Sequence, residues 1–323
     1  MSLSVFWKKE SNGVKKNITN IVVSVTWAGS IEQASRTAEI GIPNSESDTN
    51  IKALGLKIEC GDFMILKEDE KTLFNGQVTS IEKKGATEST LSYVCEDMLK
   101  NLLRSTGTYK FKNKTPEYIT KMLCNSFGIK VGEIAAIGLA IEKMFCEEVE
   151  IYNIIKKAYK KATKNTGQKY IIRMEALKLC VRKKGEVVNN FCLSEKVNIT
   201  ASAYTETIDE MINSVVIYDS RGKKTDVVKK DAQISKFGLY QGTYTKESGV
   251  NASRAAAQLL TGKTKTVSIE AVDVTTECIA GNAVKVSDTA TGMTGKFLID
   301  SDSHTWENGV HTASFELTFE KMA

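Results

Sequence analysis

The end of the chain, residues 281–319, alternates apolar and polar residues in short runs that turn residues separate. Alternation with a period of two is typical of strands that bury one face. The segment opens with Gly281 and Asn282. Its alternating runs and the turn residues between them predict a β-meander. The residue pairs expected in its tight turns are Thr291-Gly292, Thr294-Gly295 and Asn308-Gly309.

A fainter copy of this pattern starts 220 residues earlier, at Gly61 and Asp62. It reads G-D-F-M-I-L-K-E-D-E-K-T-L-F-N-G-Q-V, with a charged turn in the middle. In each copy a second glycine, Gly76 or Gly295, is expected to precede the next strand. A chain that carries one β unit twice is more typical of a scaffold than of an enzyme.

The chain has 323 residues, which is enough for two or three domains with their own cores. Strand patterns dominate both ends, and helical periodicity appears only in the middle. We therefore expect an α+β chain, mainly β, in which two related β-barrel-like tube domains flank an α+β insertion domain. The expected boundaries are 1–110 for the first tube domain, 111–200 for the insertion and 201–323 for the second tube domain.

Two helices are expected in the insertion. Thr115 and Pro116 are typical of a helix start, and that helix is expected to end at Gly128. A second helix follows Glu150 with an apolar stripe, and Gly167 suits its C-terminal cap. Its opposite stripe is basic and could serve an anionic partner, although a solvated helix face is the simpler interpretation. The basic stripe consists of Lys156, Lys157, Lys160, Lys161 and Lys164.

Composition argues against several classes of protein. The net charge of +5 is small for this length, and the aromatic residues do not interleave with basic ones, so no sequence-specific nucleic-acid partner is expected. Seven cysteines without a C-x-x-C pair predict buried free thiols in a reducing cytoplasm. The N-terminus does not resemble a signal peptide, and the longest apolar run is too short to span a membrane.

The sequence contains few residue patterns that are typical of a catalytic or metal-binding site. The T-G-K-T string at Thr261 follows a predicted helix and precedes a strand, which is the reverse of a phosphate-binding loop. His304 and His311 could face each other across a hairpin, with Asp300 or Asp302 completing a metal site. Packing of His304 against Trp306 is the simpler alternative. We expect no catalytic, cofactor-binding or metal-binding residues.

The chain resembles the XkdQ-like tail hub family of PBSX-type phages, which is related to the phage late control protein D hubs. The match is most specific in T-G-M-T-G-K-F-L-I-D-S-D-S-H-T-W-E-N-G-V-H, and then in G-D-F-M-I-L and L-F-N-G-Q-V. F-G-L-Y-Q-G and N-T-G-Q-K-Y also resemble family features. The residues taken as structural motif positions are Gly61, Asp62, Gly76, Gly281, Asn282, Gly292, Gly295, His304, Trp306 and Gly309.

The resemblance implies a structural baseplate hub of a contractile phage tail or of a phage-tail-like particle such as a bacteriocin. Such a hub is a homotrimer between the hexameric tail tube and the trimeric central spike, and it also meets baseplate wedge and tape-measure proteins. Two β units in each of three chains would present six units to the tube. Assembly is expected in the bacterial host cytoplasm. A tail-associated peptidoglycan hydrolase or cell-wall-binding adhesin is the alternative.

Overall fold

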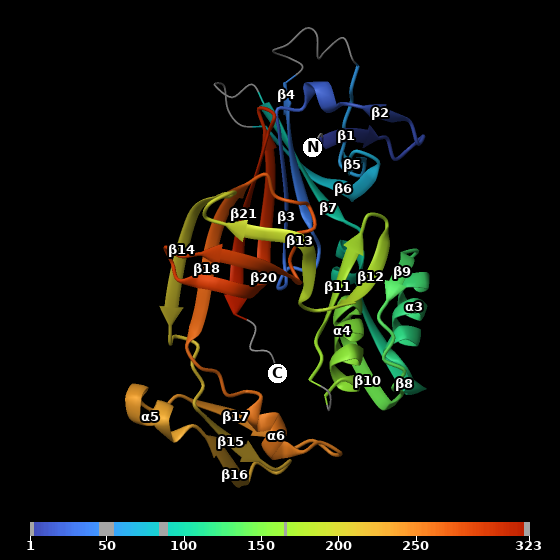
Figure 1. Cartoon of the computed structure of the whole chain (residues 1–323). Coiled ribbons are helices and arrows are strands. Elements are labelled where there is room, and N and C mark those ends of the chain that lie inside the picture. The colour runs from blue at the N-terminus through green and yellow to red at the C-terminus, as the bar shows by residue number, and fades with distance from the viewer. Residues whose placement is uncertain (1–2, 45–54, 84–89, 165–166, 320–323) are drawn as a thin grey trace. The chain divides into compact units, whose positions relative to one another are not determined.

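The computed structural model describes residues 3–44, 55–83, 90–164 and 167–319. The chain divides into two compact units, which are considered separately. One unit comprises residues 1–202 and 268–323, and the other comprises residues 203–267. Most strands of the larger unit belong to one thirteen-stranded sheet (Figure 1).

The first half of this sheet is built from the N-terminal residues. Its five central strands lie in the order β3-β4-β7-β6-β5, and all four neighbouring pairs are antiparallel. The short strands β1 and β2 continue the sheet beyond β5, and the 3-10 helix η1 follows β2. The elements are β1 (Leu3–Lys8), β2 (Lys15–Asn17), η1 (Thr19–Ile21), β3 (Ser24–Ser30), β4 (Thr37–Pro43), β5 (Phe63–Glu68), β6 (Lys71–Lys83) and β7 (Thr90–Asp97).

The second half repeats this strand order. Its strands lie in the order β14-β18-β21-β20, and β19 pairs with β20 as β5 pairs with β6. When the five strands of each half are numbered in chain order, they lie side by side in the sheet in the order first, second, fifth, fourth and third. The elements are β13 (Glu186–Ser194), β14 (Ile199–Thr207), β18 (Thr264–Val272), β19 (Asn282–Asp288), β20 (Met293–Glu307) and β21 (Val310–Phe319).

The long strand β20 joins the two halves. Its C-terminal part pairs with β3, with Trp27 opposite His304, while its N-terminal part pairs with β19. This continuity corrects one expectation, because the described strands follow an open path and neither half closes into a barrel by hydrogen bonding. The fold class itself, mainly β with a smaller helical part, is confirmed.

The α+β segment lies between the two halves in the sequence and has its own apolar core. Helix α4 buries the stripe that the sequence predicts, including Ile151, Ile154 and Ile155. Thr115 accepts a hydrogen bond from the backbone N–H of Tyr118 and so caps α3. The elements are α2 (Leu99–Leu103), β8 (Thr106–Lys114), α3 (Pro116–Ser126), β9 (Lys130–Ile134), β10 (Ile141–Glu150), α4 (Ile151–Ala162), β11 (Tyr170–Glu175) and β12 (Lys178–Lys183).

The smaller unit, residues 203–267, is a compact subdomain within the third predicted domain. It contains a three-stranded sheet in the order β16-β15-β17 and a small core formed by Val215, Ile217 and Ala256. Asn251 caps its last helix by accepting from the N–H of Arg254. The elements are β15 (Ser214–Tyr218), β16 (Lys224–Lys229), α5 (Asp231–Phe237), β17 (Gln241–Thr245) and α6 (Ala252–Ala257).

Two local predictions are wrong. Helix α4 ends at Ala162, before Gly167, because the backbone leaves the helical conformation at Thr163. The predicted turn at Thr294 and Gly295 lies inside β20, since residues 289–292 already complete the turn from β19.

All seven cysteines are free thiols; five are buried, as predicted, whereas Cys60 and Cys192 are exposed. Within the described residues, no helix is long and apolar enough to cross a membrane.

Candidate functional site

The candidate functional feature is a turn that the two halves of the sheet share. The N–H of Gly61 donates to the carbonyl of Val78 at 2.9 Å, and the N–H of Gly281 donates to the carbonyl of Ile299 at 2.9 Å. Both glycines have positive φ, +101° and +91°, a region that favours glycine. Each turn therefore docks onto the second strand of its own meander in the same way.

The second strands also carry a bulge at the matching position. The ladder between β6 and β7 skips the residue between Val78 and Ser80, and the ladder between β20 and β21 skips the residue between Ile299 and Ser301. In both cases the bulge begins directly after the carbonyl that accepts from the turn glycine. A β-bulge is a specific local feature, and its repetition supports a duplicated unit.

Gly76 and Gly295, by contrast, are not equivalent. Gly76 pairs with Met64 near the start of β5, whereas Gly295 pairs with Val286 in the middle of β19. Gly76 also has a separate packing reason, since a Cβ there would lie 2.2 Å from the ring of Phe74. The two glycines have similar places in the sequence pattern, but the strand pairing puts them at different positions in the two halves of the sheet.

The residue after each turn glycine holds a neighbouring element. The carboxylate of Asp62 accepts from the indole N–H of Trp7 in β1 at 2.9 Å and from the N–H of Glu10 at 3.0 Å. Burial opposes ionisation of Asp62, but these hydrogen bonds and the nearby Lys9 lower its pKa below the usual value. Asp62 therefore fastens β1 to the first half of the sheet.

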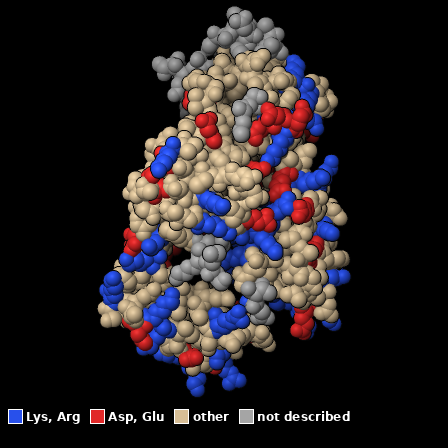
Figure 2. All heavy atoms as spheres, viewed as in Figure 1, with Lys and Arg blue, Asp and Glu red and all other residues tan. Residues whose placement is uncertain are grey.

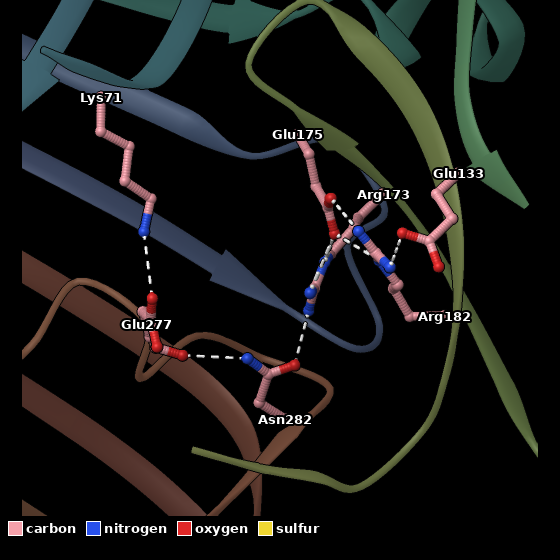
Figure 3. Close-up of polar contacts among 7 residues, drawn as sticks. All are labelled: Lys71, Glu133, Arg173, Glu175, Arg182, Glu277 and Asn282. Carbon is pink, nitrogen blue, oxygen red and sulfur yellow. Dashed lines mark hydrogen bonds and ion pairs between the residues drawn. The ribbon is translucent and has the colours of Figure 1, made fainter. Parts of the chain in front are cut away.

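Asn282 takes the same place in the second half and holds the α+β segment. Its side-chain oxygen accepts from Arg173 of β11 at 2.8 Å, and its amide donates to the carbonyl of Glu277 at 2.9 Å (Figure 3). A Cβ on Gly281 would lie 2.3 Å from Ile171, also in β11. One repeated turn is thus used twice to attach different elements.

Arg173 is part of a polar network with Glu175, Arg182 and Glu133 (Figure 3). Glu175 accepts hydrogen bonds from both Arg173 and Arg182, and Arg182 also pairs with Glu133 at 2.5 Å. Although burial disfavours the Glu175 carboxylate, Arg182 and Arg173 together lower its pKa to about 2. The network holds a fixed charge arrangement next to Asn282.

A buried ion pair lies where the two halves of the sheet meet. Arg36, which precedes β4, donates to both carboxylate oxygens of Asp302 in β20, with a distance of 2.9 Å from Nη1 to Oδ1. Asp302 also accepts from the N–H of Ala280, and the guanidinium lies 4.1 Å from the ring centroid of Trp27. These contacts pair the two buried charges with each other, while Nε of Arg36 has no hydrogen-bond partner among the described residues.

The predicted histidine pair is present, and packing dominates its surroundings. Nδ1 of His304 lies 3.0 Å from Nε2 of His311, and Nε2 of His304 donates to the carbonyl of Cys278 at 3.0 Å. That donation leaves Nδ1 of neutral His304 as an acceptor for the Nε2–H of His311. His311 stacks on Trp306 with ring centroids 4.3 Å apart. Asn308 and Gly309 both have positive φ in the hairpin turn, as predicted for a two-residue loop.

The contacts around the two turns, the ion pairs and the histidine pair are structural in kind. In the described part of the chain, no three or more His, Cys, Asp or Glu side chains are grouped to hold a metal ion. Helix α6 precedes strand β18 around Thr261 and Gly262, so the T-G-K-T string lacks the strand-to-helix order of a phosphate-binding loop. Sequence reasoning missed Arg36 and Arg173, because each finds its partner more than 100 residues away.

Comparisons with known proteins agree with this architecture. The "Phage-like element PBSX protein XkdQ" of Bacillus subtilis (strain 168) is 27% identical over 307 residues, which cover 92% of each chain. The 43 kDa tail protein of prophage MuSo2 from Shewanella oneidensis has a similar fold, with a TM-score of 0.73, 15% identity and 97% of each chain covered. A tail protein from Neisseria meningitidis MC58 gives a TM-score of 0.72 with 16% identity, covering 99% of this chain and 97% of the other.

The fold is accordingly that of prophage tail proteins. A family model described as YQBQ-like matches residues 25–318, which include both halves of the sheet, the α+β segment and the smaller unit. The chain belongs to the YQBQ-like family.

Proposed function

We propose that the protein is a structural, non-enzymatic component of a phage tail baseplate, and specifically its central hub. In this role three copies form a ring in which six related β units face a hexameric tail tube. The opposite side of the ring keeps threefold symmetry and receives a trimeric spike. The chain then adapts one symmetry to the other by geometry alone.

One observation carries this proposal. The two halves of the sheet share a strand order, a glycine turn onto the second strand and a bulge directly after the contacted carbonyl. Two equivalent units in one chain can take quasi-equivalent places around a ring, which a single unit in a trimer cannot do. The likeness to prophage tail proteins supports the same location.

The remaining partners follow from that location. Baseplate wedge and tape-measure proteins would contact the outer and axial surfaces of such a ring. The particle is either a complete phage or a DNA-free bacteriocin, and assembly would take place in the host cytoplasm before the tail is complete.

The experiment is to purify tail particles that contain a tagged copy of this chain and to determine their baseplate by cryo-electron microscopy. The proposal expects three copies around the axis, with both β units of each copy next to the tube. Six copies, or three copies that contact the tube through only one β unit each, would contradict the symmetry-adaptor role. Incubation of the purified protein with cell walls separates the hydrolase alternative, which requires soluble fragments to appear.

A further inference from the structure

The net positive charge of the protein is concentrated in the α+β segment. Residues 106–183 contain 16 Lys and Arg against 7 Glu and no Asp, a net charge of +9, while the whole chain carries +5. The remainder of the chain is therefore acidic, at −4. Basic and acidic side chains are interspersed on the face of the molecule in Figure 2, so the position of individual lysines decides what the segment can bind.

The two-stranded ribbon of β8 and β10 brings lysines and an aromatic ring together. Lys110 pairs across the strands with Phe145, and Lys112 pairs with Lys143, so these four side chains share one face of the ribbon. The other face packs inward through Phe111. Phe145 is 48% exposed, and the Lys110 ammonium lies 5.3 Å from its ring centroid.

Two lysines of α4 extend this surface along the free edge of β10. The Lys157 ammonium donates to the carbonyl of Phe145 at 3.2 Å, and the Lys161 ammonium donates to the carbonyl of Lys143. Strand β10 pairs only with β8 among the described strands, so these carbonyls lie on its unpaired edge. The contacts place the α4 lysines beside the outward face of the ribbon.

In the described part of the chain, no carboxylate pairs with the lysines of this surface. Within the described residues, Lys110, Lys112, Lys143 and Lys157 form no ion pair with a carboxylate. Like charges directly opposite each other on a ribbon, as for Lys112 and Lys143, disfavour the folded state. A bound anion between them would remove that repulsion.

We propose that this surface, formed by Lys110, Lys112, Lys143, Phe145 and Lys157 and called the basic ribbon, binds single-stranded nucleic acid without regard to sequence. Lysines would contact phosphates, and bases would stack on the exposed ring of Phe145. Tyr118, 47% exposed with the Lys114 ammonium 4.1 Å from its ring centroid, offers a second ring of the same kind.

Two other anionic partners fit less well. Lysine is depleted in protein–protein interfaces, so an acidic protein segment does not explain a surface made mostly of lysine. A membrane surface would need an exposed apolar stripe, and the apolar stripe of α4 is buried in the core. The sequence expectation rested on the low net charge and on the lack of aromatic residues interleaved with basic ones, and the pairing of β8 with β10 changes the second point by placing Lys110 beside Phe145. Contacts to phosphate and to a ring face carry no sequence information.

The test measures fluorescence anisotropy of a labelled oligothymidylate, about 20 nucleotides long, with the full chain. The triple variant Lys110→Glu, Lys112→Glu, Lys143→Glu should weaken binding at least tenfold at low salt. It should also reduce the slope of log affinity against log salt by about 2, because each lost phosphate contact removes about 0.7. Phe145→Ala should weaken binding about tenfold with little change in salt slope.

A matched control makes the same charge change elsewhere, in the variant Lys223→Glu, Lys224→Glu, Lys246→Glu, whose three lysines are exposed in the smaller unit. It should bind as the unaltered protein does. Circular dichroism and the urea midpoint establish that each variant is folded.

Three results would overturn the proposal. They are no binding of the oligonucleotide by the unaltered protein at about 50 mM salt, equal loss in the ribbon and control variants, and an unchanged affinity in Phe145→Ala. Tighter binding of polyglutamate or of anionic phosphatidylglycerol vesicles than of the oligonucleotide would instead assign the surface to an acidic protein or to a membrane.

Discussion

The guanidinium of Arg36 and the carboxylate of Asp302 form a buried, two-point ion pair between residues that are 266 positions apart in the sequence. Arg36 leads into the second strand of the first β unit, and Asp302 lies in the fourth strand of the second. The pair lies where β20 and β3 join the two halves of the sheet. It fixes the two β units relative to each other through charge as well as through backbone hydrogen bonds.

Replacement of Asp302 by alanine should lower the free energy of unfolding by about 3–5 kcal/mol, because it leaves the buried Arg36 charge without a partner. Urea denaturation followed by tryptophan fluorescence measures the change. Glu277→Gln is the control, since it removes the exposed ion pair between Lys71 and Glu277 and should cost less than about 1 kcal/mol. Equal losses in the two variants would contradict a structural role for the buried pair.

Alanine at Gly281 should be more destabilising than alanine at Gly61, although both have positive φ. Backbone strain of about 1–2 kcal/mol applies to both. Only at Gly281 does the new Cβ also clash, at 2.3 Å from Ile171, whereas the nearest atom to a Cβ on Gly61 is Gln77 Nε2 at 3.9 Å. Overpacking should add about 1–3 kcal/mol. Ile171→Val, made together with Gly281→Ala, should recover part of that difference in urea denaturation.

The histidine pair should make stability depend on pH. Burial, and then the charge of His304, lowers the pKa of His311 to about 4, and burial also lowers the pKa of His304. Because the unfolded state binds more protons, stability is complete above the unfolded pKa of about 6.5 and falls as pH drops from there towards 4.

A series of urea midpoints between about pH 7 and pH 4 measures this dependence. The variant His311→Phe should show a shallower decline across the same window. Glu175 would contribute below that window, since its pKa of about 2 means that its stabilisation is lost only as pH falls below its unfolded value. A decline that is identical in His311→Phe would exclude the histidine pair as its source.

The turn residue Asp62 should control the attachment of β1. Asp62→Ala leaves the Trp7 indole N–H and the Glu10 N–H without their acceptor, which should cost about 1–3 kcal/mol. Hydrogen exchange should then accelerate in residues 3–8 more than in β20. Asp62→Asn retains one acceptor oxygen and should show a smaller effect. Equal exchange rates of residues 3–8 in Asp62→Ala and Asp62→Asn would contradict the role of the Asp62 hydrogen bonds in attaching β1.

Local sequence patterns predicted much of the secondary structure. Thr115 and Pro116 start α3, the apolar stripe from Ile151 defines the buried face of α4, and Asn308 with Gly309 forms the hairpin turn. These features depend on neighbours within one or two helical turns or on a two-residue loop, so the information is contained in the nearby residues. The repeated glycine turns at Gly61 and Gly281 were recognisable for the same reason.

Contacts that depend on strand register could not be predicted from the sequence. Gly295 has the composition of a turn residue, yet it lies within β20 because pairing with β19 continues through it. Lys110 and Phe145 are distant in the sequence, so their interleaving arises only when β8 pairs with β10. A one-residue shift in either ladder would move these side chains to the opposite face.

The sequence by itself thus determined that this protein carries one β unit twice around an α+β segment, since alternation and turn residues are local properties. Only the tertiary structure decided that Arg36 meets Asp302, that Arg173 meets Asn282, and that the two units form an open sheet and not two closed barrels. The physical reason is that strand pairing over long sequence separations is selected by the packing of the whole fold, which no short stretch of residues specifies.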